Sequence, residues 1–168
     1  MDLPLATTLT GYNISLWIHI TAVVVGLGAT FAESILMPVA MKGDPRHMPL
    51  VFRIQLVLNR YFANPALLVI IITGIYQAVE YDWDFGAPWI SATFVIVFIL
   101  GGINGAYFVP TDRKLLAMSE KEIADAGDGP VEWSEEFQTM TRTEGFFGAM
   151  TGLLIVIAIF LMVVKPGA

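Results

Sequence analysis

The sequence predicts an all-α fold: a polytopic membrane protein with four transmembrane helices in an antiparallel bundle. The chain is 56% hydrophobic and only 14% charged, and a soluble domain of 168 residues has no core large enough to bury that much apolar surface. Four apolar runs reach the length of about 20 residues that a helix needs to cross a bilayer. They cover roughly residues 12–40, 61–79, 89–109 and 146–164. No segment alternates polar and apolar residues as membrane strands do, so strands are not expected.

Turn residues set the expected ends of the first helices. The first helix should end near Met41, because the turn sequence Lys-Gly-Asp-Pro follows it. A second helix should begin near Pro49 and bend at Pro65, since proline removes a backbone hydrogen bond. The short loop 81–88 then makes the second and third spans an antiparallel hairpin.

A polar segment, residues 111–141, is expected to form a helical loop on the cytoplasmic side. It should contain a short helix over 111–125, which the turn sequence Gly-Asp-Gly-Pro ends. Ser134 and the two glutamates after it are typical of a helix start, so the fourth helix should run from there to Val164. We expect the whole chain to be one domain.

Basic residues predict the orientation of the bundle. Of the nine Lys and Arg residues, only Lys165 lies beyond the fourth span; the others are Lys42, Arg46, Arg53, Arg60, Arg113, Lys114, Lys121 and Arg142. Because basic loops stay in the cytoplasm, both termini should be outside and the two longer loops inside, as in a multi-pass protein of the bacterial inner membrane. The first eleven residues contain no Lys or Arg, so a cleavable signal peptide is not expected.

Charge and cysteine content exclude some classes of function. The net charge of −6 argues against nucleic acid as a partner. The chain has no cysteine, which excludes disulfides and thiolate metal sites. The expected surroundings are the lipid bilayer, and the glycine pairs Gly101/Gly105 and Gly148/Gly152 predict close helix packing in the cytoplasmic half. The same glycine faces could instead bind other membrane subunits or a second copy of the chain.

The first span carries two ionisable residues, His19 and Glu33, which a lipid-facing helix would not contain. They are 33 − 19 = 14 residues apart with Gly26 midway, so all three fall close to one helical face. Fourteen residues of helix cover about 21 Å, which predicts two separate sites at different depths. Gly26 between them should let a neighbouring helix come close.

His19 has two interpretations at its expected position near the outer membrane surface. It could be a neutral histidine that bonds a hydroxyl or carbonyl group of a neighbouring helix. It could also be an axial ligand to the iron of a haem, with Met162 as the candidate sixth ligand. The other histidine, His47, lies in a cytoplasmic turn about 35–40 Å away along a helix, too far to bind the same haem in one chain.

A second set of polar residues is expected in the cytoplasmic half of the membrane. Glu33 should bond one of these neighbours, since an unpaired carboxylate in lipid is costly. The cluster could be a structural clasp or a proton or substrate site. One acid with two amides lacks the histidines or paired carboxylates of metal sites, so no metal cluster is predicted. The cluster consists of Glu33, Arg60, Asn64, Asn104, Arg142 and Glu144, with Tyr107 nearby.

Short motifs along the chain resemble a superfamily of four-helix bacterial membrane proteins. The motifs are Trp17-Ile-His-Ile20, Asn59-Arg60, Asn64-Pro-Ala-Leu67 before Thr73-Gly74, and Leu161-Met-Val-Val-Lys-Pro166. The superfamily contains HemJ-type protoporphyrinogen oxidases, copper-resistance-D-like (CopD-like) proteins and a predicted integral-membrane domain of unknown function, to which the chain is most similar.

This resemblance implies a four-helix fold and contact with b haem. HemJ-type proteins bind b haem through a histidine early in the first helix, a position that matches His19. The chain lacks two features of the HemJ-type pattern: an arginine after Pro38, and an Arg-Arg run where it has Arg60 alone. Its loop 111–141 is also longer. The resemblance therefore implies haem or porphyrin contact without specifying protoporphyrinogen oxidation.

Three hypotheses of function follow from these features. The first is a protein that binds b haem or another tetrapyrrole through His19 and has a redox or electron-transfer role. The second is a non-catalytic accessory or assembly subunit of a larger membrane complex. The third is a transporter of metal ions or small solutes, which four helices without a repeat make the weakest of the three. Whether the chain is an enzyme is left open.

Overall fold

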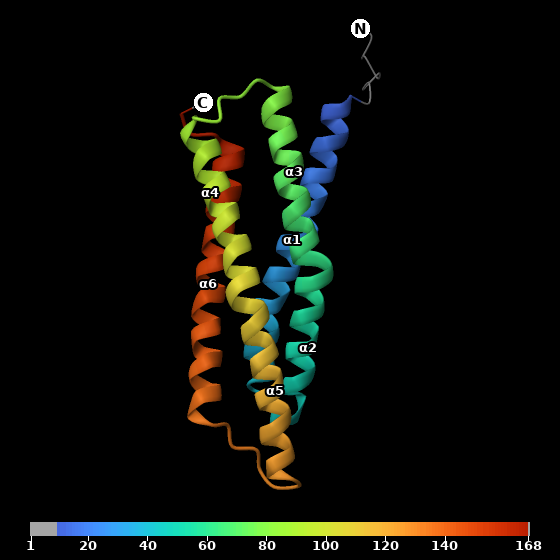
Figure 1. The fold of residues 1–168 in the computed structure, drawn as a ribbon, viewed down its shortest axis with the longest axis vertical. Coiled ribbons are helices and arrows are strands. Elements are labelled where there is room, and N and C mark those ends of the chain that lie inside the picture. The colour runs from blue at the N-terminus through green and yellow to red at the C-terminus, as the bar shows by residue number, and fades with distance from the viewer. Residues whose placement is uncertain (1–9, 168) are drawn as a thin grey trace.

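The computed structural model describes residues 10–167, and every regular element in that range is helical. These residues form four long helical rods, and Figure 1 shows them in an antiparallel bundle, with the start of the first rod, the loop 81–87 and the end of the fourth rod at one end. All four rods are long and apolar enough to cross a membrane. The expected absence of a signal peptide concerns mainly residues 1–9, which lie outside the described range.

Each rod is one uninterrupted run of helix. The first is α1 (Gly11–Ala40), and the last is α6 (Glu135–Val164). The second consists of the 3-10 turn η1 (Pro45–His47), α2 (Met48–Leu58), the π-helical turn η2 (Asn59–Ala63) and α3 (Asn64–Glu80). The third consists of α4 (Pro88–Ile103), the π-helical turn η3 (Asn104–Phe108) and α5 (Val109–Ala126).

The helix ends largely match the prediction, with one difference. The first helix ends before Met41, the second rod begins a few residues before Pro49, and the fourth begins after Ser134. The third rod does not stop near residue 109, however, and the expected short helix over 111–125 is its continuation. Nothing in that polar stretch breaks a helix until Gly127, whose φ of +54° ends it.

The two π-helical turns both stand just before a proline. Pro65 is the second residue of α3, and Pro110 is the second residue of α5. A proline inside a helix lacks the N–H donor and clashes with the carbonyl group four residues earlier, and a widened turn relieves both effects. Asn104 Nδ2 donates to Asn64 Oδ1 over 2.9 Å and so joins the two widened turns.

Small residues pack α1 against α3. The buried residues of α1 are Ser15, Ala22, Gly26 and Ala29. A methyl group on Gly26 would lie only 2.6 Å from Cβ of Ala66, so the two backbones approach each other as closely as a glycine allows. The expectation that Gly26 admits a neighbouring helix is thus confirmed, and that helix is α3.

The glycine pairs of the third and fourth rods play a smaller part than expected. A methyl group on Gly101 would meet Leu67 Cδ2 at 2.9 Å, but one on Gly105, Gly148 or Gly152 would have no atom of residues 10–167 within 4 Å. The predicted packing through both pairs within the described range is therefore wrong for three of the four glycines. The physical reason is the rotation of each helix about its axis, which leaves these three glycines facing open space.

We call the end of the bundle with both termini the termini end, and the opposite end the basic end. The basic end has a side-chain core of Met48, Phe52, Leu115 and Phe137. Arg46 donates through Nη2 to the carbonyl oxygens of Gly127 (2.7 Å) and Gly129 (2.9 Å), which ties the α1–α2 turn to the α5–α6 loop.

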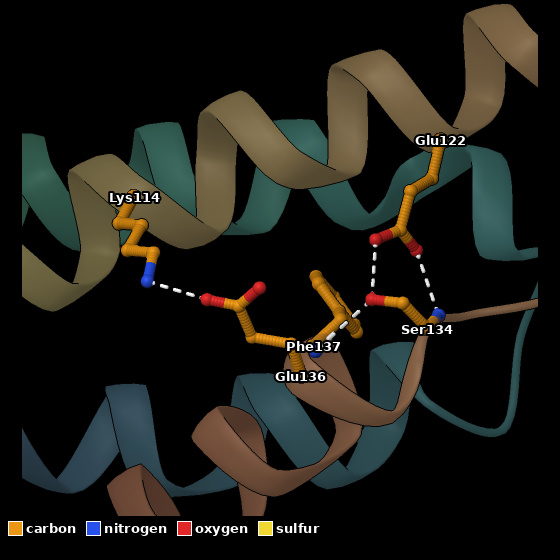
Figure 2. A network of polar contacts seen from close by, with 5 residues as sticks. All are labelled: Lys114, Glu122, Ser134, Glu136 and Phe137. Atoms are coloured by element: carbon orange, nitrogen blue, oxygen red, sulfur yellow. Dashed lines mark hydrogen bonds and ion pairs between the residues drawn. The ribbon is translucent and has the colours of Figure 1, made fainter.

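Figure 2 shows how α6 is fixed to α5 at this end. Ser134 Oγ accepts from the backbone N–H of Phe137 at 3.2 Å and donates to Glu122 at 2.6 Å. Lys114 pairs with Glu136 at 2.6 Å. The serine thus caps α6 as the sequence predicts, and Glu122 holds that cap from the neighbouring helix.

Candidate functional site

Two cavities lie in the bundle, one above the other. The cavity toward the termini end has a volume of about 340 Å³, and the cavity toward the basic end has a volume of about 590 Å³. Five aliphatic side chains line both of them and so form a layer between them: Leu27, Leu67, Ile70, Leu100 and Ile155. His19 lines the first cavity and Glu33 the second, so the two ionisable residues of α1 belong to different sites.

The termini-end cavity contains a histidine in a defined orientation. His19 Nδ1 lies 2.7 Å from the hydroxyl oxygen of Thr73 on α3. That hydroxyl is 2.6 Å from the carbonyl oxygen of Val69, to which it donates its single proton. Thr73 must then accept from Nδ1–H of His19. A neutral ring with its proton on Nδ1 keeps a lone pair on Nε2, which is the form of histidine that binds a metal.

Met162 lines the same cavity from α6, so the structure brings together the two residues that the sequence proposes as haem ligands. Aromatic side chains surround its mouth: Tyr81 contacts Trp83 at a ring distance of 5.4 Å, and Trp83 contacts Trp89 at 5.2 Å. Lys165 Nζ lies 4.1 Å from the centre of the Trp83 ring. The cavity therefore has apolar walls, an imidazole ring, a thioether and a lysine side chain at its edge.

Four members of the polar cluster that the sequence predicts line the basic-end cavity, namely Glu33, Asn104, Arg142 and Glu144. The other two do not. Asn64 bonds Asn104 from the second rod, and exposed Arg60 lies over the ring of Tyr61 at 5.4 Å. His47 is exposed at the basic end, as expected.

Glu33 does not bond the donors that the sequence offers it, which corrects that expectation. Its Oε1 atom is buried and has no hydrogen-bond partner. The charged groups that act on it are two further acids, Glu144 and Asp112. Of the expected donors, Asn104 donates to Asn64 instead, and the Arg142 side chain is exposed.

Asp112 is the residue that the sequence analysis missed. It is 1% exposed, lines the basic-end cavity from α5, and its carboxyl group lies within hydrogen-bonding reach of that of Glu144. In the sequence, Asp112 stands among other charged residues, a context that is typical of a solvent-exposed helix. The signal that could have found it is its spacing, because Asn104, Phe108 and Asp112 stand four apart and line the cavity on one helical face.

The basic-end cavity gathers oxygen atoms that lack partners. Six buried side-chain oxygen or nitrogen atoms have no hydrogen-bond partner in the described part of the chain, and all six are oxygens of residues that line this cavity. The residues are Glu33, Gln55, Asn104, Asp112, Glu144 and Thr151. Among residues 10–167, no three His, Cys, Asp or Glu side chains converge as they would to hold a metal ion.

Comparison with known proteins identifies the sequence family of the chain. No curated protein and no solved structure matches the chain. A sequence family described as "Predicted integral membrane protein (DUF2269)" matches residues 13–166, which is nearly the whole chain and includes both cavities. The four membrane-length helices agree with that description. The chain therefore belongs to this family of predicted integral membrane proteins, DUF2269.

Proposed function

We propose that this protein binds b haem or a closely related tetrapyrrole in the termini-end cavity and has a redox, electron-transfer role in the membrane. The observation that carries the proposal is the orientation of His19. Its Nδ1–H is held by Thr73, so the ring keeps its Nε2 lone pair for a metal. Histidine ligands of metals are commonly fixed in this way by a bond to the other ring nitrogen.

The remaining residues of the cavity fit such a group. Met162, which lines the same cavity from α6, would offer a thioether as a second ligand. Lys165, held over Trp83, is suited to pair with a carboxylate side chain of a tetrapyrrole at the membrane surface. The HemJ-type resemblance, which places a haem-binding histidine at the position of His19, agrees with this assignment.

A bound haem would supply one-electron chemistry, and the surrounding residues would set its conditions. Thr73 orients the imidazole of His19, the thioether of Met162 would help to hold the iron and favour its reduced state, and the aliphatic layer separates this cavity from the acidic one. Under this proposal both termini lie outside, in agreement with the distribution of basic residues, and the cavity is near the outer membrane surface.

The test is the visible spectrum of the protein purified in detergent from cells that make haem. We expect a Soret band that His19→Ala abolishes. The matched control is His47→Ala, which changes the other histidine of the chain and should leave the band unchanged. A colourless wild-type protein, even after reconstitution with hemin, would contradict the proposal.

The second candidate is an accessory or assembly subunit of a larger membrane complex. The observation that favours it is the open space at Gly105, Gly148 and Gly152, which no side chain of this chain fills. A colourless protein that co-purifies with other subunits, and loses them in Gly152→Leu, would support this candidate over haem binding. Transport of metal ions or small solutes remains the third, and only solute flux in liposomes would favour it.

A further inference from the structure

The basic-end cavity is a second site that the haem proposal does not use. Its volume of about 590 Å³ falls within the range of roughly 300–1,000 Å³ that small-molecule sites occupy. It reaches the surface of the chain, since exposed residues such as Met41 and Gln138 form part of its wall. Most of the wall is apolar, with side chains such as Met37, Leu67 and Phe108.

The polar part of this wall contains acceptors that no donor of the described residues reaches. Gln55 and Thr151 are only 7% and 8% exposed, yet Gln55 Oε1 and Thr151 Oγ1 have no partner. Together with Asn104 and the acids they make six orphaned oxygens around one space. A buried acceptor left unpaired is unfavourable, so six of them indicate that a ligand rich in hydrogen-bond donors completes the site.

The charged residues in the cavity wall also indicate what kind of ligand fits. Glu33 from α1, Asp112 from α5 and Glu144 from α6 all line it, and α2 contributes the neutral Gln55. The one basic residue in the wall, Arg142, is exposed and forms no ion pair with any residue in the described range. Burial without a counter-charge disfavours the ionised form of these acids, and a positively charged ligand is the kind that would stabilise that form.

A metal ion fits these observations less well than an organic cation. No three acidic or histidine side chains of the described residues converge on one point, and a metal would fill only a small part of the space. A protonated amine needs only one or two carboxyl groups beside its N–H donors, and its apolar body would fill the rest of the space against the aliphatic wall.

We infer that the basic-end cavity binds a small organic cation of the primary-ammonium class, whose N–H groups are received by Asp112 and Glu144 and whose apolar body packs between α1, α3 and α6. The apolar wall residues would select for size, and the neutral oxygens of Gln55 and Thr151 would select for the number of N–H donors. This site does not depend on haem, and neither proposal falls with the other.

The experiment is calorimetric titration of the full-length protein in neutral detergent with phenethylammonium chloride. We expect saturable binding that Asp112→Asn and Glu144→Gln each weaken about tenfold or more, because each removes a charged hydrogen-bond acceptor while keeping the side-chain shape. The matched control is Glu136→Gln, an exposed acid on the same helix as Glu144 that pairs with Lys114 and should bind as wild type does.

Two further measurements test whether the inference is wrong. Benzyltrimethylammonium carries the same charge without N–H donors and should bind about tenfold more weakly or worse, if the orphaned oxygens are what the ligand meets. Gln55→Leu, which removes an uncharged acceptor, should weaken the binding of phenethylammonium and leave the binding of benzyltrimethylammonium unchanged. Equal binding of both ions, binding that survives the Asp112→Asn/Glu144→Gln double variant, or binding of Mn²⁺ alone would overturn the inference.

Discussion

At the scale of single residues, the two interpretations of His19 prove to be compatible. The ring does bond a hydroxyl group of a neighbouring helix, as one interpretation states. That same bond places the ring proton on Nδ1 and leaves Nε2 available, as the other interpretation requires. Glu33 differs, because none of the donors expected for it, amides and arginines among the described residues, bonds its Oε1 atom, and its electrostatic neighbours are two further acids.

Thr73→Val tests the role of the hydroxyl that fixes His19. If haem is bound through Nε2, losing the acceptor for Nδ1–H should weaken haem retention about 10–100-fold, the usual effect of removing such an outer partner. The measurement is the rate of haem transfer to apomyoglobin. The control is Thr93→Val, since Thr93 lines the same cavity but its hydroxyl bonds Trp89 of its own helix. Equal rates for both variants would show that Thr73 does not position the ligand.

At the scale of helices, close approach depends on one small residue of α1 more than on the glycine pairs. Ala22 and Gly26 stand four apart on the buried face of α1, opposite Ala66 and Thr73 of α3. The sequence contains this small-residue spacing as plainly as it contains Gly148 and Gly152. Which of several such pairs forms a contact is decided by the rotation of each helix about its axis, and that rotation depends on all the neighbours at once.

Gly26→Ala and Gly152→Ala should therefore differ sharply in their effect on the stability of the protein. The first places a methyl group 2.6 Å from Ala66 Cβ and should destabilise the protein by about 1–3 kcal/mol through overpacking. The second meets nothing within 4 Å and should be neutral or slightly stabilising, because alanine favours helix over glycine. Thermal unfolding of both variants in the same detergent measures the difference. A Gly152→Ala protein that is the less stable of the two would contradict the packing described here.

At the scale of the whole molecule, two cavities are stacked along the bundle axis with an aliphatic layer between them. The layer keeps the histidine cavity and the acidic cavity apart, so a charge in one is insulated from the other by apolar side chains. Both termini lie at the end with the histidine cavity, and the tied loops lie at the other (Figure 1). Each site would then open toward a different side of the membrane.

Cysteine labelling tests this arrangement in the membrane, because the natural chain has no cysteine. Glu80→Cys and Asp128→Cys place single thiols at exposed positions on opposite ends of the bundle. With both termini outside, a membrane-impermeant maleimide should label Glu80→Cys on intact cells and Asp128→Cys only after the membrane is opened. The reverse pattern would mean that the bundle is inserted the other way.

The sequence alone predicts a large part of this protein. Composition and run length predict four membrane helices, and the serine before two glutamates predicts where the last one starts, because these features act locally. The depth difference between His19 and Glu33 follows from helical rise alone. These properties depend on residues close together in the chain or on the periodicity of one helix.

Tertiary structure decided which side chains meet. Asp112 looks like a solvated residue in a charged segment, and only the passage of the third helix beyond the membrane-length run brings it to Glu144 and Glu33. Likewise, the bond of His19 to Thr73 joins residues 54 positions apart, which no local pattern specifies. Such contacts depend on how the helices are rotated and staggered against each other, and that is a property of the whole bundle, to which every interface contributes.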